Sequence, residues 1–292
     1  MKVGRGLVLA FGMVLVTAST AGPTEAVVAK TAILIGAGDI ARCTSLADEK
    51  TAALIARIPG TVFTAGDNAY DDGSAANFAC YNRSWGRVKA RTRPVVGNHD
   101  YETRGASAYF DYFGAAAGPR GKGWYSYNVG AWHVVALNSN CDEVGGCEAG
   151  SPQERWLRAD LAANHARCTL AIWHHPRWSS SKHGNMARSD AFWRDLYADG
   201  AELVIVGHGH EYERFAPLNP SGTVDRPRGI REFMVGTGGA ELKPFAAIAP
   251  HSEVRNATTF GVLMLALRPT GYTWRFLPAG GTFTDSGSGV CH

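Results

Sequence analysis

The stretch Ala65-Gly66-Asp67-Asn68-Ala69-Tyr70 decides how the rest of the sequence is interpreted. It follows the short apolar run 61–64, which has the composition of a β-strand. An aspartate and a tyrosine therefore stand at the carboxyl end of a strand, where open α/β sheets form their binding sites. Taken alone, the pattern is more typical of an Asp-Asn turn. Its interpretation as a site depends on whether other strands end in the same way.

Four other β-prone runs also end in polar side chains that bind metal ions. These ends are Gly38-Asp39, Gly97-Asn98-His99-Asp100, Trp173-His174-His175-Pro176 and Gly207-His208-Gly209-His210. Parallel strands bring such ends to one edge of a sheet, and glycine lets the backbone turn sharply beside a ligand. Each motif alone fits a turn or an ordinary histidine, but the joint pattern indicates a metal site. Carboxylate, amide, phenol and imidazole donors suit two ions such as iron, manganese or zinc.

Strands alternate with helices in the first two-thirds of the sequence, and strands dominate the end. Helices are predicted at 45–58, 77–88, 151–163 and 186–197 from the spacing of apolar residues. Strands are predicted at 31–37, 61–64, 94–96, 123–128, 131–137, 169–173, 202–206, 231–235, 260–267 and 272–277. The order favours an α/β protein with two sheets packed face to face and helices outside.

Composition excludes several classes of protein. The chain has 292 residues, of which 45% are hydrophobic and 19% charged, as in a globular protein with a sizeable core. A formal net charge of +3 is too small to indicate binding to nucleic acid or to a membrane surface. Neither nucleic acid nor a membrane surface is therefore an expected partner.

The first 26 residues have the pattern of a secretory signal peptide. Lys2 and Arg5 are followed by the apolar run 7–16 and then by small residues. A membrane anchor is the alternative, but the run is about half of the roughly 20 residues that a span needs. We expect residues 27–292 to form a single domain that is secreted or extracytoplasmic.

Six cysteines agree with export, because disulfides persist in oxidising compartments. Cys141 and Cys147 flank a glycine-rich loop that a disulfide would close. The remaining cysteines would pair as Cys43 with Cys80 and Cys168 with Cys291, although spacing alone leaves the connectivity open.

The five strand-end motifs resemble, in order and spread, those of the calcineurin-like metallophosphoesterases. The usual first motif has a histidine two residues after its aspartate, and here that position is Ala41. The second motif supplies Tyr70 instead, and this exchange resembles the purple acid phosphatases. The resemblance implies a four-layer α/β/β/α sandwich of two mixed sheets with flanking helices.

The resemblance also implies seven ligands for two metal ions. The first ion, expected to be iron because of the phenolate, would be bound by Asp39, Tyr70 and His210. The second, expected to be zinc, manganese or iron, would be bound by Asn98, His174 and His208. Asp67 would bridge the two ions. A hydroxide on or between the metals would attack phosphorus in line with the leaving group.

Three further residues receive catalytic expectations. His99 would steady developing charge or protonate the leaving oxygen. Asp100 would orient His99, although a surface aspartate in a turn is an equal alternative. His183 would bind phosphate or act as an acid, and a solvated loop histidine is its alternative.

Other residues near the motifs have structural expectations. His175 is expected just outside the ligands, and His133 within a strand. Glu213 and Arg214 are expected to form an ion pair.

The sequence thus predicts a secreted two-metal phosphatase acting on phosphate monoesters. Two alternatives remain. The same site would serve a phosphodiesterase or nucleotidase, and a protein that binds phosphate without turnover would keep the fold.

Overall fold

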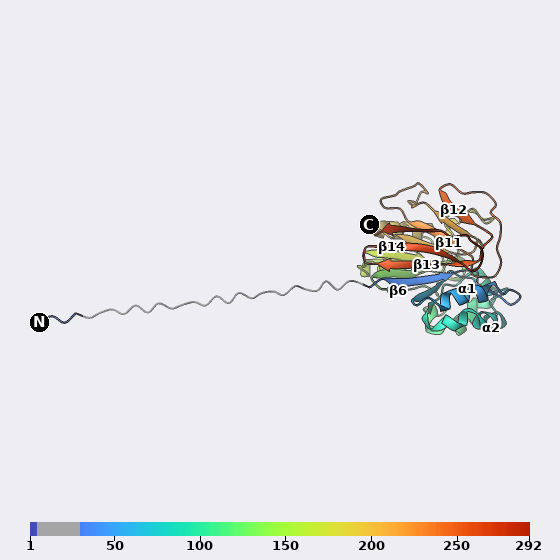
Figure 1. The fold of residues 1–292 in the computed structure, drawn as a ribbon, viewed down its shortest axis with the longest axis horizontal. Helices are drawn as coiled ribbons and strands as arrows, with labels where there is room; N and C mark the ends of the chain where they lie inside the picture. Colours follow the sequence, from blue (N-terminus) through green and yellow to red (C-terminus); the bar gives the residue numbers. More distant parts are fainter. Residues whose placement is uncertain (5–29) are drawn as a thin grey trace.

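The structure, a computed structural model, describes residues 1–4 and 30–292. Two large mixed sheets form its centre, and helices flank them (Figure 1). The four-layer prediction is therefore confirmed. The predicted signal peptide falls almost entirely outside the described residues.

The first sheet has six strands in the order β15-β14-β13-β1-β3-β5. β1 runs parallel to β3 and antiparallel to β13. The strands are β1 (Ala32–Ala37), β3 (Thr61–Thr64), β5 (Thr92–Arg93), β13 (Gly261–Arg268), β14 (Gly271–Pro278) and β15 (Ser286–Val290). The carboxyl ends of the parallel strands β1 and β3 carry the first two motifs.

The second sheet has seven strands in the order β12-β10-β11-β9-β8-β7-β6. Its central strands β7, β8, β9 and β11 run parallel. The strands are β6 (Tyr125–Val129), β7 (Trp132–Ala136), β8 (Cys168–Ile172), β9 (Leu203–Val206), β10 (Tyr212–Phe215), β11 (Arg231–Val235) and β12 (Ser252–Asn256). A small separate pair is formed by β2 (Ala41–Arg42) and β4 (Ala69–Tyr70).

Helices form the two outer layers. The α-helices are α1 (Ala47–Ala56), α2 (Ala75–Arg83), α3 (Asn98–Glu102), α4 (Ser107–Phe113), α5 (Pro152–Ala163) and α6 (Asp190–Asp199). The 3-10 helices are η1 (Trp85–Arg91), η2 (Arg104–Ala106), η3 (Gly114–Ala117), η4 (Cys141–Glu143) and η5 (Ala187–Ser189). Local signals set their ends. Ser151 accepts a hydrogen bond from the Glu154 amide at the start of α5, and Gly200 ends α6 in a left-handed conformation.

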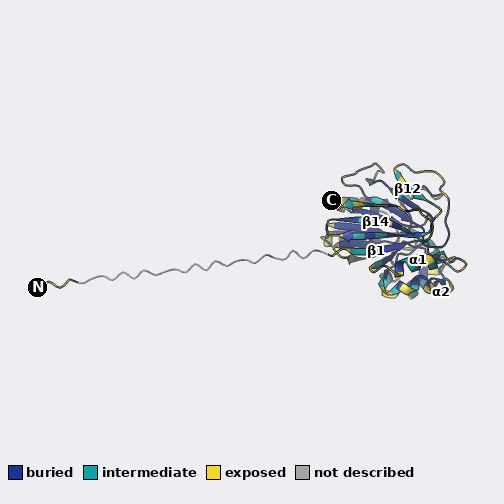
Figure 2. Ribbon diagram, viewed as in Figure 1, coloured by how far each residue is buried: buried dark blue, intermediate teal, exposed yellow. Residues whose placement is uncertain are grey.

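Successive side chains along strands of the second sheet point to opposite faces, so this sheet contributes to two hydrophobic cores, one on each face. On β9, Leu203 and Ile205 join the core between the sheets, whereas Val204 and Val206 pack with α5 and α6. Aromatic pairs such as Trp132–Tyr272 and Phe233–Trp274, each with ring centroids 5.6 Å apart, join the two sheets. Most of the strand surface is consequently buried (Figure 2).

Some predicted elements differ from the observed ones. Residues 94–96 are not a strand, because pairing with β3 ends at Arg93 and the chain then turns into α3. The helix predicted at 77–88 is broken at Ser84, where α2 gives way to η1. The strands β10, β12 and β15 were not predicted. The remaining predicted helices and strands are found within a few residues of their expected bounds.

Three disulfides are present, and they have the pairing considered above: Cys43–Cys80, Cys141–Cys147 and Cys168–Cys291. The bond between Cys168 and Cys291 ties β8 of the second sheet to the chain just after β15 of the first. In residues 1–4 and 30–292, no helix has the length and apolar character to cross a membrane.

The contact between α5 and α6 generates a prediction about pH. Burial, followed by the neighbouring Glu154 carboxyl, raises the pKa of Asp195 to about 6. An unfolded aspartate has a pKa of roughly 3.9, so the folded protein binds more protons between these values. The contribution of Asp195 to the free energy of unfolding is complete below about pH 4, and it is lost as the pH rises through about 6. Asp195→Asn should therefore flatten the pH dependence of the unfolding free energy in this window.

Urea denaturation at a series of pH values measures this effect. Asp111→Asn, which alters a surface ion pair with Arg120, is the matched control. A slope that is the same for Asp195→Asn and the unsubstituted protein would contradict the assignment.

Candidate metal centre

The ends of β1, β3, β8 and β9, with β4 and α3, bring all seven predicted ligands to one place. Asp39 and Asp67 follow β1 and β3, Tyr70 ends β4, and Asn98 begins α3. The histidines follow the second sheet: His174 comes after β8, and His208 and His210 come after β9. Their side chains form two groups around the carboxylate of Asp67.

The first group surrounds the hydroxyl of Tyr70. This hydroxyl lies 2.7 Å from Asp39 Oδ1, 2.8 Å from Asp67 Oδ2 and 3.1 Å from His210 Nε2. Asp39 Oδ1 is also 3.3 Å from His210 Nε2. All four side chains are almost completely buried. Two carboxylates, a phenol and an imidazole thus direct four donor atoms at one another.

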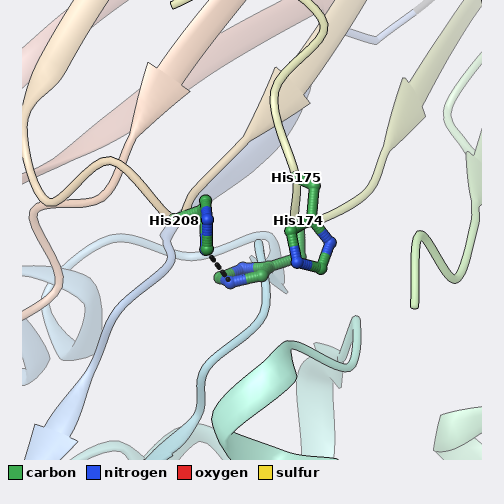
Figure 3. A group of neighbouring side chains, drawn as sticks. All are labelled: His174, His175 and His208. Carbon is green, nitrogen blue, oxygen red and sulfur yellow. Dashed lines mark hydrogen bonds between the residues drawn. The ribbon is translucent and has the colours of Figure 1, made fainter. Parts of the chain in front are cut away.

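The second group surrounds Nε2 of His174. This atom lies 3.0 Å from Asn98 Oδ1, 3.2 Å from Asp67 Oδ2 and 3.3 Å from His208 Nδ1. Figure 3 shows the ring nitrogens of His174 and His208 facing each other. The other nitrogen of His174, Nδ1, is 2.8 Å from the carbonyl of Ala65. When Nδ1 donates to that carbonyl, Nε2 is free to bind a cation.

Asp67 Oδ2 belongs to both groups, whereas its Oδ1 accepts a hydrogen bond of 2.8 Å from the His99 amide. The residues fit two cations, because each group offers four donors of types that bind iron, zinc or manganese. Among the described residues, histidines and carboxylates alone form two separate sets that could hold a metal ion, namely Asp39, Asp67 and His210, and His174, His175 and His208.

Burial and neighbouring charges shift the pKa values at the centre. Burial raises the pKa of Asp67, but the charge of His174 and a hydrogen bond with it outweigh burial and lower the pKa. Burial lowers the pKa of His174, and Asp67 more than reverses this, so that the value rises to about 9. Burial, then Asp39 and Asp67, raises the pKa of Tyr70 well above its ordinary range. The phenol is therefore protonated and donates to these carboxylates.

The backbone is strained at four of the seven residues. Asp39, Asp67, His208 and His210 have φ angles of 57°, 49°, 73° and 62°, in the left-handed region that non-glycine residues rarely adopt. Such conformations cost roughly 1–3 kcal/mol each and concentrate at functional sites. Gly97 permits the close approach, because a Cβ there would lie 2.1 Å from the amide nitrogen of Asp67.

His99 lies beside the first group. Its ring centroid is 4.4 Å from that of Tyr70, and its Nδ1 is 2.5 Å from the carbonyl of Asp71. Arg42, which the sequence analysis did not single out, lies 3.0 Å from the Asp71 carboxylate and 5.3 Å from the Tyr70 ring centroid. Arg42 directly follows Ala41 of the first motif, and this position in the sequence could have indicated that it lies near the centre.

Asp100 does not make the predicted contact with the His99 ring within the described residues. Its carboxylate instead accepts hydrogen bonds from the amides of Asn68 and Gly97 and from the Asn68 side chain. Burial, followed by the charge of Asp67, raises the pKa of Asp100 to about 7. Asp100 thus joins the loops that carry Asp67 and Asn98.

Two further histidines lie next to His208. The ring centroid of His183 is 4.4 Å from that of His208, and that of His175 is 4.6 Å from it. His183 is exposed, and His175 is buried. The structure therefore brings His183 to the edge of the centre.

The structural expectations have mixed outcomes. His133 lies buried in β7 and bonds to Asp160, as predicted. Glu213 and Arg214 do not pair with each other, because adjacent strand residues point to opposite faces of β10. Glu213 bonds to Ser180 and Ser252, whereas Arg214 pairs with Glu253 and Asp285.

Comparison with known proteins defines the family. The model of the calcineurin-like phosphoesterases matches residues 37–212, and the chain belongs to this family. An uncharacterized protein of Mycobacterium tuberculosis is 29% identical over an alignment of 215 residues that covers 60% of this chain and 40% of that protein. Purple acid phosphatase 18 of Arabidopsis thaliana is 31% identical over 147 residues, covering 47% of this chain and 32% of the relative. The chain thus spans less than half the length of these relatives.

Solved structures share the fold. A purple acid phosphatase from yellow lupin (Lupinus luteus) seeds has a TM-score of 0.77 at 18% identity, covering 89% of this chain and 54% of the other. A dimetal phosphatase from Danio rerio has a TM-score of 0.58 at 14% identity, covering 89% of this chain and 99% of the other.

The shared oxygen of Asp67 generates a prediction about metal content. Asp67→Asn keeps a residue that tolerates the left-handed backbone but removes the charge common to both groups. We expect the purified variant to contain less than half of the metal bound by the unsubstituted protein, measured by plasma mass spectrometry. Asp111→Asn is the control for loss of a surface carboxylate. A variant that retains two ions per chain would contradict the shared role.

Proposed function

We propose that this protein is an exported phosphatase that hydrolyses phosphate monoesters at a centre of two metal ions. The observation that carries the proposal is the presence of two four-donor groups that share Asp67 Oδ2. Family membership supports a phosphoric ester hydrolase. The three disulfides and the signal-like amino terminus support export.

The donor sets support an assignment of the metals. Tyr70 in the first group favours iron, and the neutral donors of the second group suit zinc, manganese or iron. Asp39, Tyr70 and His210 would hold the first ion, Asn98, His174 and His208 the second, and Asp67 both. When bound, such a pair of ions lowers the pKa of a water molecule and stabilises charge on the attacking and leaving oxygens.

The surrounding residues would bind the substrate and move protons. His99 donates from Nδ1 to the Asp71 carbonyl, so its Nε2 is the atom available to a phosphate ester. As an imidazolium, it would stabilise charge on phosphate or protonate the leaving oxygen. His183 would contact phosphate from the exposed side of His208. Asp100 would act as a positioning residue through Asn68 and Gly97.

Hydrolysis of two nitrophenyl esters tests the proposed function. We expect release of p-nitrophenol from p-nitrophenyl phosphate, with kcat/KM at least tenfold above that for bis(p-nitrophenyl) phosphate. A preference for the diester would favour a phosphodiesterase. An absence of turnover in metal-loaded protein that still binds phosphate would favour a binding protein.

His99 generates a prediction about turnover. His99→Ala should lower kcat by roughly 10²–10⁴-fold, the range for a lost proton donor, with the bound metal retained. Activity and metal content are measured on the same preparation. His165→Ala, in the loop between α5 and β8, is the control. An unchanged kcat would remove His99 from the reaction.

Tyr70 generates a prediction about colour. A phenolate bound to ferric iron absorbs visible light, so the iron-loaded protein should be coloured and Tyr70→Phe should lose that band. Tyr112→Phe, which alters a tyrosine of α4, should keep it. A colourless iron-loaded protein, or a band that survives in Tyr70→Phe, would contradict iron at the first group.

A further inference from the structure

A polar cavity opens directly beside the second group of the candidate metal centre. Its volume is about 320 Å³, and its lining includes Asn98 and His175. Asn98 Oδ1 is one of the four donors of the second group, so the cavity begins at the centre itself. A phosphoryl group at the metals would leave the rest of an ester within reach of this space.

His175 presents a ring nitrogen to the cavity. The Ser139 hydroxyl accepts the His175 amide at 2.9 Å and lies 2.8 Å from Nδ1 of the ring. When the hydroxyl donates its hydrogen to Nδ1, the ring hydrogen stands on Nε2. Nε2 has no hydrogen-bond partner among the residues at 30–292, although the side chain is only 4% exposed. Nε2 is not one of the enclosed polar atoms that lack a partner, so it is open to the cavity and available to an atom of a ligand there.

The walls of the cavity carry an excess of negative charge. Glu102 comes from α3, and Asp142 and Glu143 come from η4. None of these carboxylates forms a salt bridge within the described part of the chain. Arg188 of η5 is the single cation in the lining, and it too lacks an ion pair there. The cavity is therefore suited to a positively charged group and opposes an additional anion.

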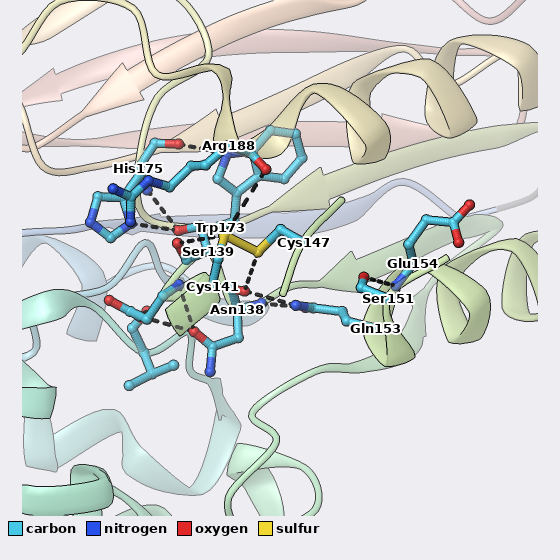
Figure 4. Close-up of a disulfide and its surroundings, with 12 residues drawn as sticks. Asn138, Ser139, Cys141, Cys147, Ser151, Gln153, Glu154, Trp173, His175 and Arg188 are labelled. Atoms are coloured by element: carbon cyan, nitrogen blue, oxygen red, sulfur yellow. Dashed lines mark hydrogen bonds between the residues drawn. A yellow bond between two sulfur atoms is a disulfide. The ribbon is translucent and has the colours of Figure 1, made fainter. Parts of the chain in front are cut away.

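The acidic wall is held in place by covalent bonds and hydrogen bonds. The Cys141–Cys147 disulfide closes the loop that carries Asp142 and Glu143. Figure 4 shows this disulfide beside Ser139, His175 and Arg188. Gln153 donates to the Asn138 carbonyl at 2.8 Å and thereby fixes the start of the loop. Such pre-organisation allows the wall to discriminate between ligands without first becoming ordered.

We propose that this cavity is the subsite for the leaving group, and that it selects phosphate esters whose alcohol carries an ammonium group over those whose alcohol carries a carboxylate or a second phosphate. The inference rests on the proposed phosphatase function. His175 Nε2 would donate to an oxygen of the ester, and the acidic wall would attract the ammonium group. The carboxylates are exposed, so the selectivity is moderate and weakens with salt.

A series of stable phosphonates tests the subsite without requiring turnover. The ligands are 2-aminoethylphosphonate, n-propylphosphonate and 3-phosphonopropionate, which are similar in size and end in a positive, neutral and negative group. Calorimetric titration of the metal-loaded protein at low salt should give the tightest binding for the amine. The expected difference between amine and carboxylate is roughly 3–10-fold, the sum of several exposed charge pairs.

The double variant Asp142→Asn/Glu143→Gln should reduce this ratio to about 1–2-fold, since it removes two charges while keeping similar shapes. Asp199→Asn, at the far end of α6, should leave the ratio unchanged. Equal binding of the three phosphonates by the unsubstituted protein would overturn the subsite. So would a ratio that persists in the double variant.

The phosphonate and p-nitrophenyl phosphate experiments together distinguish a failure of the leaving-group subsite from a failure of the proposed phosphatase function. Turnover of p-nitrophenyl phosphate with equal phosphonate binding would overturn the subsite alone. Graded binding that depends on Asp142 and Glu143, without turnover of any ester, would overturn the phosphatase and leave the subsite standing. Failure of all three phosphonates to bind would overturn the subsite, and p-nitrophenyl phosphate turnover would then decide the function.

Discussion

The position of one carboxylate oxygen, Asp67 Oδ2, is the constraint on which the candidate centre depends. It lies within hydrogen-bonding distance of Tyr70 in the first group and close to His174 in the second. Several features hold it there: the amide of His99 binds the other oxygen, and Gly97 leaves room for the loop. A buried carboxylate in contact with both a phenol and an imidazole is well suited to share its charge between two cations.

The fold produces this arrangement because strands of both sheets end next to one another at the same side of the molecule. Asp39, Asp67 and Tyr70 come from the first sheet and its small neighbour, whereas His174, His208 and His210 come from the second. Aromatic pairs between the sheets, including Phe233–Trp274, fix their separation. The strained backbone at Asp39, Asp67, His208 and His210 can persist because rigid strands on both sides hold the ends of each loop.

Much of the fold and the gathering of the seven residues followed from the sequence, because the five motifs that carry these residues each follow an apolar run. Other features depended on tertiary contacts. The strand β15 has the sequence Ser-Gly-Ser-Gly-Val and owes its conformation to pairing with β14. Besides nearby Gly97, Asp100 bonds to Asn68, which is 32 residues away, and Arg214 bonds to Asp285, which is 71 residues away. Local spacing does not reveal such contacts, so the expected Asp100–His99 and Glu213–Arg214 contacts were wrong.

The central claim is that two cations flank Asp67 Oδ2. Anomalous X-ray diffraction from crystals of the purified protein, recorded on both sides of the iron, zinc and manganese absorption edges, measures this directly. The account predicts two anomalous peaks roughly 3.5–4 Å apart, one beside Tyr70 and His210 and the other beside Asn98 and His208. A single peak, or two peaks that lack Asp67 as a common neighbour, would contradict it.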